Sequence, residues 1–270
     1  MSKSDVSDGV DGFGIDLMES HTAYASGISL LVAFILFSAL ELRYPWRYWS
    51  LTTLRRSFTV NIGLFLLNNL VLPLFSVSTL LALAGRHSSP GLLDNLPPST
   101  AAILSFVLFD LTLYLWHRLS HQVAWLWQFH RVHHSDVTMN VSTAFRVHVL
   151  DHLTMTAFKV AYVVGFGIDQ ETLARNEAIT ALFLMFHHSN LMFKSERILR
   201  YLIIVPELHR LHHSMHRREH DNNYGAVLSV WDRLFGTLKT GQPEALGIAG
   251  LIPSGFFGLI RAGLGGGQLT

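Results

Sequence analysis

The 270-residue chain is half hydrophobic, carries charge on only 14% of its residues and contains no cysteine. A soluble domain usually has about 25% charged residues, so this composition predicts a membrane protein. The net charge of +1 gives no basic field for binding nucleic acid. The lack of cysteine excludes disulfides, Cys-ligated zinc and Cys-ligated iron–sulfur clusters.

The first 25 residues are acidic and contain several Gly and Ser residues, which predicts a mobile arm. They lack the basic start and apolar core of a secretory signal. Residues 26–240 are predicted to form a single membrane-embedded domain, and residues 241–270 a Gly-rich C-terminal tail.

Five apolar segments follow one another along this domain, and a membrane-spanning helix needs about 20 such residues. They cover residues 25–42, 58–85, 100–116, about 153–168 and about 173–186. The second contains Pro73, which leaves open one long kinked helix or a re-entrant pair. The last two are short, so half-membrane helices are an alternative. The sequence therefore predicts an all-α integral membrane bundle of about four or five segments with a histidine-rich helical cap.

The basic residues predict on which side of the membrane this cap lies. With one crossing per segment, most of them fall on a single side: Arg43, Arg47, Arg55, Arg56, Arg118, Arg131, Arg146, Lys194, Arg197 and Arg200. The opposite loops hold only Arg86 and Arg175 and the acidic arm. Because cytoplasmic loops carry an excess of Lys and Arg, the histidine-rich part is predicted to face the cytoplasm.

Histidine is concentrated in one part of the chain. Only His21 and His87 lie outside residues 117–220, which leaves 14 of the 16 inside it. Three boxes contain eight of them: His117 and His121; His130, His133 and His134; and His209, His212 and His213. Residues three or four apart share a helix face, and neutral imidazole is the commonest side-chain metal ligand. One tetrahedral site needs about four ligands, so the boxes predict two metals.

Two further histidines are candidate ligands outside the boxes. His188 ends the fifth apolar segment and has Asn190 beside it, whereas His187 is either a ligand or a packed neighbour. His148 is predicted as a ligand, with a supporting role near the metal as the alternative. The remaining histidines of the region, His152, His216 and His220, are predicted to lie on the polar surface.

An intramembrane carboxylate precedes the first box. Asp110 lies seven residues before His117, on the same face of the predicted helix. A carboxylate in such a segment is a functional candidate by default, and a ligating imidazole commonly donates its second N–H to one. Asp110 is therefore predicted to orient His117, with Tyr114 nearby.

The ligand type alone does not choose among zinc, copper, iron and nickel. A hydrolytic dizinc site is expected to include a bridging carboxylate, and the three boxes contain none. Apolar sequence behind the boxes suits an oily substrate. Attack on its unactivated C–H bonds requires O₂ and a redox metal, which favours iron.

The order and spacing of the boxes resemble the fatty acid hydroxylase/sterol desaturase superfamily over about residues 100–240. The resemblance lies in HRLSH, HRVHH, HHSN, PELHRLHHS (206–214), NYG (223–225) and WDRLFGT (231–237). FRVHVLD (145–151) is similar to the FRxHPxE pattern of this superfamily, with Val149 in place of Pro and Asp151 in place of Glu.

This resemblance implies a membrane-bound, non-haem di-iron oxygenase. Such an enzyme uses O₂ and two electrons to hydroxylate or desaturate a lipid, such as a sterol, a fatty acyl chain or a polar lipid. No cytochrome b5-like or flavin motif is visible, so a separate protein is expected to donate the electrons. Hydroxylation in a bacterial inner membrane is favoured. Desaturation by the same centre, metal transport or storage, and a structural zinc in an inactive homologue remain as alternatives.

Overall fold

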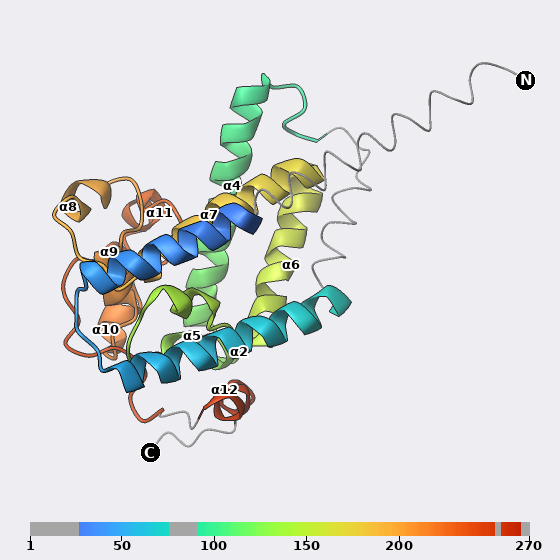
Figure 1. Ribbon diagram of the computed structural model, residues 1–270. Helices are drawn as coiled ribbons and strands as arrows, with labels where there is room; N and C mark the ends of the chain where they lie inside the picture. The colour runs from blue at the N-terminus through green and yellow to red at the C-terminus, as the bar shows by residue number, and fades with distance from the viewer. Residues whose placement is uncertain (1–26, 76–90, 252–254, 266–270) are drawn as a thin grey trace, which may run out of the picture.

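The computed structural model describes residues 27–75, 91–251 and 255–265, and regular structure within these ranges is helical (Figure 1). The long helices are an unlabelled one at residues 27–43, α2 (Leu51–Phe75), α4 (Pro98–Gln122), α6 (Val149–Phe166) and α7 (Gln170–His188). The short ones are α5 (Ala124–His134), η1 (Val141–Phe145), α8 (Glu196–Leu199), α9 (Pro206–His212), α10 (Arg217–His220), α11 (Val230–Leu234) and α12 (Phe256–Gly263). The prediction of an all-α fold is thus confirmed for the described residues.

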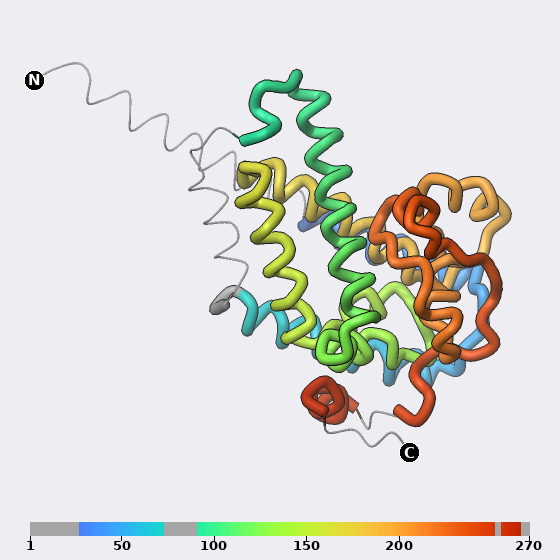
Figure 2. Tube along the Cα trace, turned by 180° about the vertical axis from the view of Figure 1, so that it is seen from behind, coloured from blue at the N-terminus to red at the C-terminus, as the bar shows by residue number. Residues whose placement is uncertain are grey.

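The long helices lead to one end of the molecule, where the short helices gather. Seen from behind, α4 and α6 run side by side, and α7 crosses beside them (Figure 2). The end of α4 meets α5, and α9 and α10 lie next to it. This layout places the three histidine boxes at the same end of the bundle.

A buried polar cluster joins α4, α6 and α7. The hydroxyl groups of Ser105 and Tyr162 lie 3.0 Å apart, and Asn176 donates to both of them at 2.8 and 3.0 Å. Phe109 packs against the Tyr162 ring with centroids 5.1 Å apart. Hydrogen bonds between helices are favourable in lipid, where no water competes for the polar groups. This cluster therefore fixes the three helices to one another.

Among the described helices, α4 and α6 are long and apolar enough to cross a membrane. They correspond to the third and fourth predicted segments. The first forms the helix at residues 27–43, and the second runs as one helix through Pro73 to the end of α2, with residues 76–85 outside the described ranges. The fifth is α7, whose first half carries Glu171, Arg175 and Glu177 and is too polar for a span. The described helices thus provide two candidate spans, and the predicted total of four or five membrane segments stays a prediction.

The C-terminal region differs from the predicted Gly-rich tail, because residues 256–263 form α12. Leu259 of this helix is buried and packs in one cluster with Leu64 of α2 and Val132 of α5. The guanidinium of Arg131 donates to the Ala262 carbonyl at 2.7 Å. The apolar residues FFGLI favour a helix, but the glycines that follow them led to the prediction of a tail.

A buried carboxylate fixes η1 against α2. Asp136 accepts hydrogen bonds from Ser57 at 2.7 Å, Asn61 at 3.1 Å and Thr143 at 2.9 Å. Burial alone would raise the pKa of Asp136, but the nearby guanidinium of Arg146 and these hydrogen bonds outweigh it and lower the pKa to about 2. The carboxylate therefore stays ionised and holds the loop after α5 in place.

We expect Asp136→Asn to lower the free energy of unfolding by about 2 kcal/mol at neutral pH. The folded pKa lies below the unfolded value of 3.8, so this stabilisation is complete above that value and is lost as the pH falls through about 2. Unfolding in detergent, followed from pH 7 down to about 2, should show the difference between variant and wild type shrinking. A difference that stays constant over this range would contradict the role of the charge.

Candidate metal centre

Four helix ends deliver the histidine side chains. His117 and His121 lie one turn apart in the last two turns of α4. The chain then reverses at Val123, in extended conformation, and α5 carries the second box. Pro206 begins α9, which carries His209 and ends at His212, and His213 caps it. His188 is the last residue of α7.

The structure brings nine of the ten histidines predicted as ligands into two groups. One consists of His117, His121, His130, His134 and His212, and the other of His133, His188, His209 and His213. Within each group, one ring nitrogen of every residue lies within 4.8 Å of the others, and all nine residues are buried. The groups adjoin, since the rings of His134 and His213 stack with centroids 4.4 Å apart. Each group mixes boxes, so neither is formed by a single motif.

Most of these rings are oriented by an oxygen atom on their outer side. The Nδ1 atoms of four of them lie 2.7 to 3.2 Å from backbone carbonyls. These pairs are His117 with Tyr224, His133 with Arg146, His188 with Leu184, and His212 with Asn222. Because a carbonyl only accepts, each of these Nδ1 atoms carries the hydrogen, and a neutral ring then has a bare Nε2.

These bare nitrogen atoms face one another in pairs. The Nε2 atoms of His117 and His212 are 3.0 Å apart in the first group, and those of His133 and His188 are 3.0 Å apart in the second. With each Nδ1 protonated, no hydrogen remains to bridge the two lone pairs. Burial lowers the pKa of His133 and His212 well below 6.5, so an additional proton does not supply the missing positive charge at neutral pH.

Further ring nitrogens in the two groups also lack a partner. They include Nε2 of His121 and His130 and both nitrogens of His134 and His213. An unpaired buried polar atom is destabilising, and a native fold retains such atoms where an ion or water completes them. Burial lowers the pKa of His130 to about 3, which keeps its ring neutral and able to ligate. A metal cation in each group would pair with the facing nitrogen atoms and with one nitrogen of each of these unpaired rings.

Two carboxylates orient two further rings of the first group. Asp151 lies 3.0 Å from Nδ1 of His130, and Asp221 lies 3.3 Å from Nδ1 of His121. Such contacts fix the tautomer of a ligating imidazole and raise its basicity. Sequence reasoning placed Asp151 beside the boxes without this role and did not select Asp221. The position of Asp151 in FRVHVLD was the one available signal.

The sequence predicted that Asp110 orients His117, but its carboxylate binds other groups in the structure. Its carboxylate accepts from the backbone N–H groups of Val227 and Leu228 at 2.8 and 3.0 Å, and from the indole of Trp231 at 2.8 Å. It therefore binds the loop before α11, and the contact with His117 is made by the Tyr224 carbonyl of that loop. Asp110 acts on His117 through this loop because the helix face aims its side chain at α11.

Tyr114 belongs to the same support. Its hydroxyl lies 2.9 Å from Oγ1 of Thr237, which donates to Asp232 at 2.7 Å. Asp232 in turn accepts from the N–H groups of Tyr224 and Gly225 at 2.8 and 2.9 Å. The motifs NYG and WDRLFGT thus form one clamp around the Tyr224 carbonyl. A Cβ at Gly225 would lie 2.6 Å from the Leu228 carbonyl, so only glycine fits there.

Asn190 contacts the loop that follows the first helix, away from the two histidine groups. Its side-chain amide donates to the Arg47 carbonyl at 2.8 Å and accepts from the Arg47 N–H at 3.2 Å. Its own N–H donates to Glu41 at 3.0 Å. Asn190 therefore holds the chain after His188 in place and reaches the metal centre only through that backbone.

Three other histidines were placed incorrectly or left open by the sequence. His148 lies outside both groups, because its Nδ1 caps α6 by accepting from the Leu150 N–H at 3.2 Å and its ring stacks on Phe129. His187 is buried, and its ring centroid lies 4.0 Å from that of His209, but it belongs to neither group. His220, predicted at the surface, is buried and stacks on Trp127, with centroids 5.2 Å apart.

Residues 102–237, about half of the chain, match the family described as fatty acid hydroxylase. The chain belongs to this family. The matched range contains all nine grouped histidines and the clamp around Tyr224. The resemblance deduced from the boxes is confirmed.

Several relatives carry names of lipid-modifying enzymes. The chain is 32% identical to ornithine lipid hydroxylase of Rhizobium tropici over 166 residues, which cover 60% of this chain and 50% of that protein. It is 31% identical to human alkylglycerol monooxygenase over 50% of this chain and 30% of that protein. Mouse cholesterol 25-hydroxylase is 28% identical over 58% of this chain and 55% of its own. The chain thus spans about half or less of these relatives, and no solved structure matches it significantly.

We expect removal of metal to destabilise the protein, because the facing nitrogen atoms then lack a cation between them. Adding ferrous iron at about 100-fold excess over its dissociation constant should restore about 3 kcal/mol, seen as a rise in the thermal unfolding midpoint. Magnesium, which prefers oxygen ligands, should give no shift and serves as the control. An unfolding midpoint that is the same with a chelator and with iron would contradict a metal centre.

Proposed function

We propose that the protein is a membrane-bound di-iron oxygenase that hydroxylates a C–H bond of a lipid. The observation that carries this proposal is the pair of adjoining, carboxylate-poor histidine groups at the end of the candidate span α4. Membership of the fatty acid hydroxylase family and the lipid hydroxylases among the relatives support it. We also propose that the protein lies in a bacterial inner membrane, with its two histidine groups on the cytoplasmic side.

The nine grouped histidines are the proposed iron ligands, five for one ion and four for the other. The Nε2 atoms of three contacting pairs are 2.9 to 3.0 Å apart. One tetrahedral zinc site needs about four ligands, so the five histidines of the first group support a metal of higher coordination number, such as iron.

Bound iron would supply the activation of O₂, in which one oxygen atom enters the C–H bond and the other leaves as water. This stoichiometry needs two electrons and two protons, and the proposed source of the electrons is a separate protein. The chain contributes a rigid, buried set of ligands, whose outer nitrogens are fixed by Tyr224, Arg146 and Asp151. Because these contacts fix the orientation of the rings, the histidines would hold the metal at a defined place beside the substrate.

The arrangement of helices supports a lipid substrate. The apolar candidate span α4 ends beside the histidine groups, and the candidate span α6 begins beside them. Trp116, directly before His117, packs edge-on against His130 with ring centroids 5.6 Å apart. A lipid chain lying along these helices reaches the centre without crossing water. Desaturation of the same lipid by the same centre is the alternative outcome.

The ligand assignment predicts separate effects of two substitutions. His212→Ala removes a ligand from the five-histidine group, and His133→Ala removes one from the four-histidine group. Each should reduce the iron content of purified protein from two toward one per chain and abolish O₂-dependent turnover. His216→Ala, at an exposed residue between the third box and His220, is the control and should retain both. Two irons in either ligand variant would refute the assignment of that residue.

The reaction itself is tested by comparing the lipids of cells that express the wild-type chain with those of cells that express His133→Ala. Hydroxylation predicts a lipid heavier by one oxygen atom, present only with the wild type and in the presence of O₂. A product lighter by two hydrogen atoms would identify a desaturase. Purified wild-type protein that binds zinc alone and consumes no O₂ would overturn the proposed function.

A further inference from the structure

We infer that Asp221 and His220, together with His121, form the site through which ferrous iron enters the five-histidine group. The inference rests on the proposed function, since it concerns the loading of that centre. It begins from a physical requirement. All nine grouped histidines are buried, so the ions must reach them through a route that exchanges with solution.

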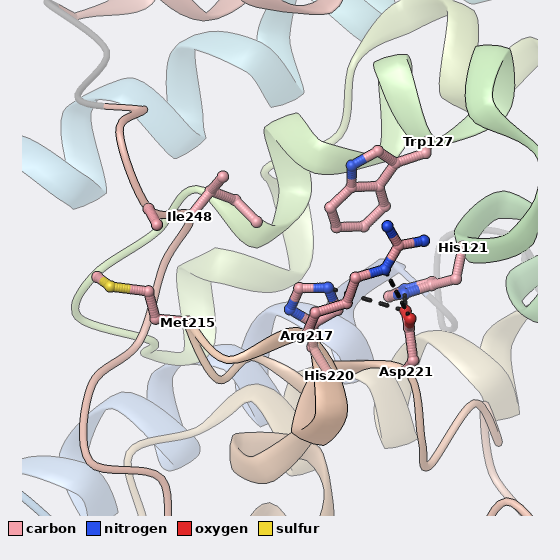
Figure 3. A pocket seen from close by; sticks show the side chains of 8 residues that line it. His121, Trp127, Met215, Arg217, His220, Asp221 and Ile248 are labelled. Atoms are coloured by element: carbon pink, nitrogen blue, oxygen red, sulfur yellow. Dashed lines mark hydrogen bonds and ion pairs between the residues drawn. The ribbon is translucent and has the colours of Figure 1, made fainter. Parts of the chain in front are cut away.

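A cavity of about 180 Å³ lies directly over one edge of the centre. Its lining includes His121, Trp127, Met215, Arg217, His220 and Asp221. Figure 3 shows the side chains of His121, His220 and Asp221 meeting in this cavity, with Arg217 beside them (Figure 3). A single water needs only about 10–15 Å³, so the space accommodates an ion with part of its hydration shell.

The three side chains have the chemistry of a transient cation site. Asp221 lies 3.3 Å from Nδ1 of His121 and 3.8 Å from Nε2 of His220. A ligand atom from each of the three lies within 4.8 Å of the others. One carboxylate and two imidazoles bind a divalent ion more weakly than five imidazoles, because they offer fewer ligands. This difference in ligand number favours movement of the ion from the entry site to the five-histidine group.

His121 links the entry site to the centre, because it belongs to both groups. Its Nδ1 faces Asp221, whereas its Nε2 is buried and has no partner. A neutral imidazole carries one hydrogen, so this ring offers Nδ1 to the entry site in one tautomer and Nε2 to the centre in the other, and it serves the two sites in turn. Asp221 is the member that solution reaches, with one third of its side chain exposed (33%). An ion held by Asp221 is therefore already next to the ring that leads inward.

Arg217 occupies the outer side of Asp221. Its Nε lies 3.0 Å from the second carboxylate oxygen of Asp221, and 77% of its side chain is exposed. An exposed ion pair of this kind contributes little stability, so an arriving divalent ion displaces the guanidinium readily. In the absence of the ion, Arg217 neutralises Asp221 and competes with cations for it.

A purely orienting role for Asp221 makes a different prediction. If Asp221 only held the His121 ring, its removal would weaken the bound ion and lower the final iron content. If it receives the ion, its removal slows loading and leaves the final content unchanged. The time course of iron uptake separates the two roles without any measurement of activity.

The experiment uses the full chain in detergent, stripped of metal by a chelator and mixed with ferrous iron under anaerobic conditions. Protein-bound iron is measured against time. With iron in large excess over its dissociation constant, we expect Asp221→Asn to slow uptake on the order of tenfold and still to reach the wild-type end point, because the amide oxygen of the substituted side chain can accept from Nδ1 of His121. His220→Gln should slow uptake in the same direction. Raising the ionic strength should slow the wild type more than Asp221→Asn.

Arg217→Ala and Arg218→Ala form a matched pair, because both remove one positive charge from α10 and only Arg217 lines the cavity. Arg217→Ala should load faster than Arg218→Ala. Uptake by Asp221→Asn at the wild-type rate, or with a reduced end point, would overturn the entry site. Failure of the wild type to bind two irons would instead contradict the proposed function.

Discussion

Two pairs of imidazole nitrogens that face each other with no hydrogen between them are the constraint on which this structure depends. In both groups, backbone carbonyls fix the hydrogen on the outer nitrogen and leave the inner one bare, 3.0 Å from another bare nitrogen. Burial excludes the proton that would otherwise relieve the repulsion. A cation between the nitrogen atoms would turn this unfavourable arrangement into a stable one.

The rest of the fold serves to hold those outer oxygen atoms still. The Tyr224 carbonyl is held because Asp232 binds the adjoining N–H groups and Asp110 binds the same loop from within α4. Arg146, whose carbonyl orients His133, is anchored by its hydrogen bond to Asn61 of α2. A substitution far from the histidines thus changes the metal centre through the position of a carbonyl. This dependence gives a reason for the burial of Asp110 and Asp232, which act on the histidines through the Tyr224 loop.

The sequence predicted the main helices and the histidines of the centre, and the reasons for its errors are physical. Spacing of three or four residues shows which side chains share a helix face, so the boxes were evident. Spacing within a box cannot show which boxes meet. The Nε2 atoms of His117 and His133 lie 3.0 Å from those of His212 and His188, which are 95 and 55 residues away. Backbone carbonyls are present at every residue, so no motif could mark those of Tyr224 and Arg146 as partners.

The same limit accounts for His148 and Asp110. His148 matched the pattern of a ligand, but the start of α6 after it offered a free backbone N–H, and its ring caps that helix. Asp110 was correctly identified as unusual, because a buried carboxylate in a span needs donors. Its donors come from residues 227–231, more than 100 positions later in the chain. Local pattern identifies a group that requires a partner, whereas only the tertiary fold identifies the partner.

X-ray absorption at the iron edge of the loaded full chain tests the central claim most directly. The account predicts five- or six-coordinate iron whose nearest neighbours are imidazole nitrogens at about 2.1 Å, with a second iron close by. His133→Ala and His212→Ala should each remove the signal of the second iron. Four-coordinate metal, or a first shell dominated by oxygen atoms without imidazole scattering, would contradict it.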